Sequence, residues 1–120
     1  MTAHPETVKD FLRAFKKAAS DSEITFAGRR KNWDALVDLN LTCAQRTDIV
    51  LGLTYTDYCE GPLKARKGGK SELWVFAVPH DSTYIYIKLK LVKATGGPRP
   101  VCVSFHEKEH PLNFPLKKEE

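Results

Sequence analysis

The segment from Tyr84 to Val92 alternates between two kinds of side chain, and this alternation constrains the fold more than any other feature of the sequence. Successive side chains of a β-strand point to opposite faces of a sheet, so the pattern predicts a strand with one buried face and one open face. The buried face carries Ile85, Ile87, Leu89 and Leu91. The open face carries Tyr84, Tyr86, Lys88 and Lys90.

Two further segments predict strands beside this one. Leu73 to Val78 is a short apolar run that ends before Pro79, and Val101 to Glu107 alternates again. The connections between the three segments are short, as they are between antiparallel neighbours. In the last segment the apolar set that should face the core is Val101, Val103 and Phe105. The open face of the sheet then combines Tyr86, Lys88, Lys90, Ser104 and His106.

The first half of the chain predicts helices. Apolar residues recur at helical spacing from Pro5 to Ala19, which indicates an amphipathic helix. Asn32 is a candidate cap for a second helix that ends near Asn40. Thr42 and Gln45 have the spacing of a capping box at the start of a third helix. Helices followed by a meander of strands predict an α+β fold, an antiparallel sheet with the N-terminal helices packed on one face.

The length and composition fit one globular domain, which we expect to span residues 1–110, followed by a polar tail at residues 111–120. Hydrophobic residues make up 42% and charged residues 28% of the chain, which excludes disordered and collagen-like classes. No apolar run approaches the roughly 18 residues of a membrane span, and no signal-peptide pattern is present. Three cysteines without a Cys-x-x-Cys pair favour a reducing cytoplasm and argue against a zinc knuckle.

The net charge of +4 permits binding to nucleic acid or to an acidic protein. Basic residues cluster at positions 29–31 and again at positions 64–70. Such clusters are also common on ordinary solvated surfaces, so they do not identify a partner alone. For an RNA-binding protein, the residues that we expect to contact phosphates are Lys90, Arg66, Lys67, Lys70, Arg29 and Arg30.

The open face combines an imidazole, a phenol and ammonium groups, which are the groups that metal-free cleavage of RNA requires. A general base removes the proton of a ribose 2′-hydroxyl, a cation stabilises the charge that grows on phosphorus, and an acid protonates the departing 5′-oxygen. His106 is the candidate acid or base, because imidazoles exchange protons near neutral pH. The alternative is a solvated sheet face on which the lysines serve only solubility.

Residues 106–110 also match H-E-x-x-H, the zinc-binding motif of metalloproteases. The two histidines of that motif reach one metal ion because they share a helix face. Here the motif begins at the end of a predicted strand, and Pro111 disfavours helical geometry at His110. His80, which follows Pro79, falls in a predicted turn. We therefore predict no metal site and no cofactor.

Several short strings, taken in order, resemble the MqsR family of bacterial toxins, whose compact fold is similar to that of RelE. The strings are Ile49-Val50-Leu51-Gly52-Leu53, Thr56-Asp57-Tyr58, Leu73-Trp74-Val75-Phe76, Tyr86-Ile87-Lys88-Leu89 and Val103-Ser104-Phe105-His106-Glu107. The resemblance covers roughly residues 8–108, and Tyr-x-Lys followed by Ser-Phe-His carries most of it. Members of the family cleave messenger RNA and are held inactive by an antitoxin encoded beside them.

The resemblance implies a catalytic tyrosine at Tyr86 and a basic catalytic residue at His106. Lys64 is nearest in character to the family's lysine before the sheet, whereas Val75 stands where the family has an amide. We therefore expect a metal-independent endoribonuclease that acts on single-stranded RNA and is neutralised by an antitoxin with a DNA-binding helix-turn-helix. The catalytic residues that we expect are His106, Tyr86, Lys88 and Lys64.

A binding module without catalytic activity is the alternative function. A small basic domain that holds RNA, DNA or an acidic protein would use Lys88, Lys90 and residues 64–70 through their charge alone. His106 would then be dispensable, whereas an endoribonuclease would depend on it.

Overall fold

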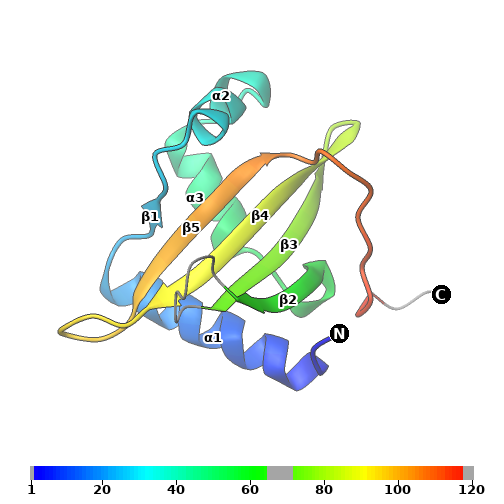
Figure 1. The fold of residues 1–120 in the computed structure, drawn as a ribbon. Helices are drawn as coiled ribbons and strands as arrows, with labels where there is room; N and C mark the ends of the chain where they lie inside the picture. Colours follow the sequence, from blue (N-terminus) through cyan, green and yellow to red (C-terminus); the bar gives the residue numbers. More distant parts are fainter. Residues whose placement is uncertain (1, 65–71, 118–120) are drawn as a thin grey trace.

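Five strands form one mixed sheet in the order β1-β5-β4-β3-β2 (Figure 1). The computed structural model describes residues 2–64 and 72–117. Its helices are α1 (Pro5–Asp21), α2 (Arg30–Asp38), α3 (Cys43–Leu51) and the short 3-10 helix η1 (Tyr55–Asp57). Its strands are β1 (Thr25–Phe26), β2 (Tyr58–Lys64), β3 (Glu72–His80), β4 (Thr83–Val92) and β5 (Arg99–Glu107). The predicted α+β class is confirmed.

The sheet is mostly antiparallel but not wholly so. Strands β2 to β5 pair antiparallel in chain order, as the short connections between β3, β4 and β5 predict. The short strand β1 differs, because it lies parallel to β5 with Thr25 opposite Val101 and Phe26 opposite Cys102. The expected antiparallel sheet is therefore corrected to a mixed sheet, in which β1 covers part of the β5 edge.

Helices α1 and α3 lie behind the sheet in the view of Figure 1, whereas α2 lies beside the β5 edge. The buried residues of α1 recur every three or four positions and form one apolar stripe. This stripe packs in a single cluster with core-facing side chains of the sheet, among them Ile85, Ile87, Leu89 and Phe105. The front face of β4 and β5 is left uncovered by α1 and α3.

Strand β4 has the register that its alternation predicts. Ile85, Ile87 and Leu89 are fully buried, whereas Tyr86 and Lys88 are only partly buried on the opposite face. A shift of one residue would place lysines in the apolar core, so burial of one face fixes the register.

Strand β5 departs from the predicted alternation at a β-bulge. Lys88 pairs with Ser104 but the next residue, Leu89, pairs with Cys102, so Val103 is an extra residue in β5. Cys102 is consequently fully buried in the core, where the sequence predicted Val101 and Val103. Val101 instead pairs with Lys90 on the open face. Phe105 and His106 lie on the far side of the bulge and keep their predicted faces.

Asn32 does not cap α2, which corrects a second prediction. The cap position belongs to Arg29, and Asn32 lies in the first turn of α2 with its side chain buried. Its Nδ2 donates to the carbonyls of Ala27 at 2.9 Å and Val103 at 3.0 Å, and its Oδ1 accepts the Phe105 N–H at 3.0 Å. The amide thus continues the hydrogen bonding of β1 along β5, and it fixes the start of α2 against the sheet.

The other local signals for helix ends are confirmed. The Thr42 hydroxyl accepts the Gln45 backbone N–H at 3.0 Å, and the Gln45 side chain accepts the Thr42 N–H at 2.8 Å, which completes the capping box of α3. Asn40 has a φ of 56° just after α2. This left-handed conformation suits asparagine and ends the helix.

After β5 the chain turns back toward the sheet. The centroids of the Phe114 and Tyr84 rings lie 5.5 Å apart, and Leu116 packs against the core cluster. Part of the segment that we expected to be a polar tail therefore contacts the domain, and its last residues, 118–120, lie outside the described residues. None of the helices in the described ranges is both long enough and apolar enough to cross a membrane.

Candidate functional site

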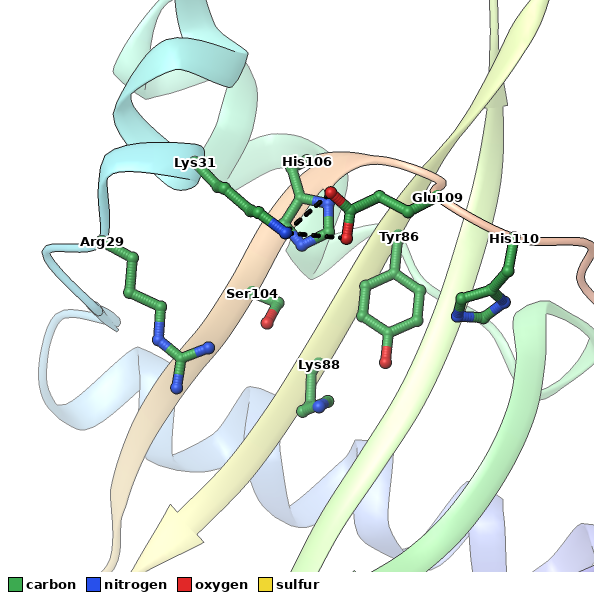
Figure 2. Close-up of a pocket in the computed structure, with 8 residues that line it drawn as sticks. All are labelled: Arg29, Lys31, Tyr86, Lys88, Ser104, His106, Glu109 and His110. Carbon is green, nitrogen blue, oxygen red and sulfur yellow. Dashed lines mark hydrogen bonds and ion pairs between the residues drawn. The ribbon is translucent and has the colours of Figure 1, made fainter.

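The open face of the sheet is hollowed into a cavity of about 340 Å³. Side chains from the start of α2, from β4 and β5, and from the segment after β5 meet there (Figure 2). The lining residues are Arg29, Lys31, Tyr86, Lys88, Ser104, His106, Glu109 and His110.

Strand pairing places the central groups of the cavity next to one another. Tyr86 lies directly opposite His106, and Lys88 lies directly opposite Ser104. The Tyr86 and His106 rings stack with their centroids 5.4 Å apart and their planes 21° apart. The Lys88 Nζ atom lies 5.8 Å from the centre of the Tyr86 ring. The structure therefore brings together an imidazole, a phenol and an ammonium group on one rigid pair of strands.

His106 has one ring nitrogen engaged by the backbone. Its Nδ1 lies 2.9 Å from the carbonyl oxygen of Glu107. A carbonyl can only accept a hydrogen bond, so Nδ1 carries the proton in this arrangement. In the neutral ring Nε2 then has a free lone pair, which suits it to take a proton from a substrate.

Tyr86 is suited to give a hydrogen bond or a proton. Burial raises the pKa of the Tyr86 hydroxyl above its usual value, and Glu60, Cys59 and Glu109 add to the increase. The phenol therefore keeps its proton at neutral pH. It is available as a donor, but the phenolate form that would act as a base is disfavoured.

Lys31 and Glu109 form an ion pair at this cavity, shown by the dashed lines in Figure 2. The Lys31 Nζ atom lies 2.9 Å from one carboxylate oxygen and 2.7 Å from the other. The hydrogen bond and the positive charge of Lys31 hold the pKa of Glu109 below its usual value, with further contributions from His106 and His110. This pair connects the start of α2 to the segment after β5.

The H-E-x-x-H motif does not form a helix. His106 belongs to β5, and His110 follows the end of that strand, as the sequence predicted. The ring of Tyr86 packs against both histidines. The His106 ring stacks on it, and the His110 ring meets it edge-on with the two ring centroids 5.7 Å apart. Within residues 2–64 and 72–117, no three His, Cys, Asp or Glu side chains are grouped as metal ligands.

Some of the predicted contact residues lie away from the cavity. Lys90 is two residues beyond Lys88 on the same face but does not line the cavity. Arg30 is almost fully exposed and pairs with Asp34 at 3.8 Å. Lys64 ends β2, which is two strands away from β4 in the sheet. Arg66, Lys67 and Lys70 lie outside the described residues.

The cavity also contains residues that the sequence did not assign to a site. Lys31 belongs to the basic cluster of Arg29, and this proximity was the available signal for it. Glu109 and His110 appeared only as part of a metal motif. Their position beside Tyr86 depends on the turn of the chain after β5, for which the sequence has no local pattern.

Neither a protein-family model, nor a curated protein, nor a solved structure matches the chain. The resemblance to MqsR toxins therefore rests on the short sequence strings alone.

Proposed function

We propose that the chain is a metal-independent endoribonuclease that cleaves single-stranded messenger RNA. The stacked pair of Tyr86 and His106 beside Lys88 carries this proposal. One group can accept a proton, the second can donate one, and the third is a cation. All three line one open cavity on the uncovered face of the sheet.

His106 acts as the general base in this mechanism. Its Nε2 removes the proton of the ribose 2′-hydroxyl, and the 2′-oxygen forms a bond to the adjacent phosphorus. The hydrogen bond from Nδ1 to the Glu107 carbonyl holds the ring in the required tautomer. The product strand then ends in a 2′,3′-cyclic phosphate.

Tyr86 acts as the general acid. As the bond between phosphorus and the 5′-oxygen breaks, the phenol donates its proton to the departing oxygen, which leaves as a 5′-hydroxyl. The raised pKa of Tyr86 keeps the phenol protonated at neutral pH but makes it a weaker acid. The proton can pass because the departing 5′-oxygen, as an alkoxide, is a stronger base than a phenolate. Arg29 and Lys88 are the cations that stabilise the phosphorane, because both line the cavity whereas Lys64 does not.

A toxin of the MqsR type with a RelE-like fold fits this chemistry. The sequence strings support that assignment, and the mostly antiparallel sheet with helices α1 and α3 behind it is compatible with it. Such a toxin acts in the cytoplasm and is neutralised by an antitoxin that carries a DNA-binding helix-turn-helix. Acidic side chains of the antitoxin would cover the cationic cavity. Expression of the chain alone should arrest growth, and growth without arrest would contradict the toxin assignment.

Incubation of the purified chain with a long single-stranded RNA tests the enzymatic activity. We expect internal cleavage at equal rates with and without EDTA, and products that carry a 2′,3′-cyclic phosphate and a 5′-hydroxyl. Intact RNA, or cleavage that EDTA stops, would contradict the proposal.

A binding module is the second candidate, and the exposed charge of the cavity rim favours it. Arg29 and Lys31 are exposed, so they could hold a phosphate without any proton transfer. This function predicts RNA binding that is unchanged in His106→Ala and an absence of cleaved products from the wild-type chain.

A further inference from the structure

Glu109 places a negative charge among the cations of the candidate site. It is the one carboxylate among the described residues that line the cavity. Its neighbours in the lining include Arg29, Lys31 and Lys88, together with the imidazoles of His106 and His110. Such a set of cationic side chains favours the binding of an anionic ligand.

The ion pair that holds Glu109 has the geometry of an anion bound by a lysine. Both carboxylate oxygens lie within 2.9 Å of the Lys31 Nζ atom. The two residues are 78 positions apart in sequence, and the pair crosses in front of the His106 ring in the view of Figure 2. The carboxylate therefore uses the donor that an incoming phosphate would need.

We propose that the Glu109 carboxylate occupies the position of an RNA phosphate, and that RNA binding displaces it from Lys31. Lys31 then donates to a phosphate oxygen, and Glu109 turns toward solvent. The RNA as ligand follows from the proposed function, but the inference concerns binding and is independent of cleavage. Glu109 acts as a built-in competing anion that limits the affinity of the site for weakly bound phosphates.

Displacement is physically accessible because the pair is exposed. The side chains of Lys31 and Glu109 have exposed fractions of 65% and 52%. Ion pairs between exposed side chains contribute little to stability, since water solvates both partners well when they separate. A phosphate that approaches Arg29 and Lys88 at the same time can therefore replace a single carboxylate.

A supporting role for Glu109 would have the opposite consequence. If the carboxylate merely held Lys31 in place for the ligand, then its loss would loosen Lys31 and weaken binding. The sign of the change in affinity thus separates the two roles.

The test measures the affinity of the full chain for a 2′-O-methyl RNA oligonucleotide, which lacks the 2′-hydroxyl nucleophile and stays intact. Glu109→Gln removes the competing charge and keeps the shape of the side chain. Removal of one like charge at close range should tighten binding about 3- to 30-fold. Lys31→Gln should weaken binding, because it removes the donor itself.

Glu107→Gln is the matched control. Glu107 is exposed and does not line the cavity. Its replacement by Gln changes the net charge by the same amount as Glu109→Gln. Strand alternation places it on the other face of β5 from His106. At 0.15 M salt, where charges are screened over about 8 Å, this variant should change affinity less than about twofold.

Four results would overturn the inference: weaker binding by Glu109→Gln, unchanged binding by Glu109→Gln, an equal change in Glu107→Gln, or no binding by any variant. Equal thermal unfolding of the two variants checks that both are folded. Cleavage of unmodified RNA by the wild-type chain is measured separately. Tighter binding by Glu109→Gln, without any cleavage by the wild type, would contradict the proposed enzymatic activity but support the proposal that Glu109 occupies a phosphate position. Cleavage by the wild type, with unchanged affinity in Glu109→Gln, would contradict only the proposal about Glu109.

Discussion

The two faces of β4 separate stability from chemistry within ten residues. On one face Ile85, Ile87 and Leu89 are fully shielded from water. On the other face Tyr86 and Lys88 are only partly buried and line a cavity. The apolar face holds the strand rigid, and rigidity is what keeps reactive groups in a fixed geometry. Substitutions on the two faces should therefore have different consequences.

A core-face substitution should have the largest effect on stability. Phe105 lies opposite Ile87, is fully buried, and follows directly after the open-face residue Ser104. Phe105→Ala should lower the free energy of unfolding by about 3–5 kcal/mol, through lost burial and the cavity that remains. Urea denaturation at 25 °C measures this. A loss below about 1 kcal/mol would show that the Phe105 side of β5 is not the core.

Asn32→Ala should lower both the stability of the core and the affinity of the open face for RNA. It therefore tests whether the two faces act independently. The substitution leaves the Phe105 N–H and the Val103 carbonyl without the partner that Asn32 supplies. The expected loss is about 2–4 kcal/mol of unfolding free energy, together with weaker RNA binding because Arg29 and Lys31 lose their anchor. Unchanged RNA affinity in a destabilised variant would show that α2 does not position the cavity.

The core face should also respond to alkaline pH. Burial raises the pKa of the Cys102 thiol to about 12, with opposing contributions from Arg46 and a backbone hydrogen bond. The thiol ionises at lower pH in the unfolded chain than in the folded chain, so stability falls as pH rises from about 9 toward 12.

Comparison of the wild type with Cys102→Ala isolates this contribution. Between pH 9 and 10.5, the wild type should lose about 2 kcal/mol more unfolding free energy than the variant. Urea denaturation at the two pH values provides the measurement. Parallel losses in both proteins would mean that Cys102 ionises in the folded state as readily as in the unfolded state.

Within the open face, two lysines of one strand should differ. Lys88 lines the cavity and Lys90 does not. In the proposed mechanism Lys88 contacts phosphate directly, so Lys88→Gln should weaken RNA binding about tenfold and slow cleavage. Lys90→Gln should have an effect of about threefold or less. Equal effects would favour a charged surface without a defined phosphate position.

The sequence predicts the parts of this arrangement that depend on a regular pattern. In β4 apolar and polar residues alternate without exception from Tyr84 to Lys90, so only one register buries the apolar set. In β5 the run Val101-Cys102-Val103 is apolar at every position. Either register is compatible with such a run, and the bulge at Val103 therefore could not be predicted.

The candidate site likewise contains residues that a local sequence pattern predicts and residues that only the tertiary packing brings together. Tyr86, Lys88 and His106 follow from alternation along two strands, which is a local property of the sequence. The pairing of Lys31 with Glu109 joins positions 78 residues apart and depends on how α2 packs against β5. Asn32 illustrates the same limit, because a capping asparagine and a buried bridging asparagine have the same local sequence pattern.

The proposed role of His106 as general base is tested by the rate of RNA cleavage by His106→Ala, measured at saturating protein and in a single turnover. We predict a rate about 10²- to 10⁴-fold below that of the wild type, because the variant lacks the proposed general base. Affinity for the 2′-O-methyl RNA and the free energy of unfolding should stay nearly unchanged, because His106 lies on the open face. Cleavage at the wild-type rate would contradict the catalytic role of His106, and a loss of stability comparable to that of Phe105→Ala would contradict its place on the open face.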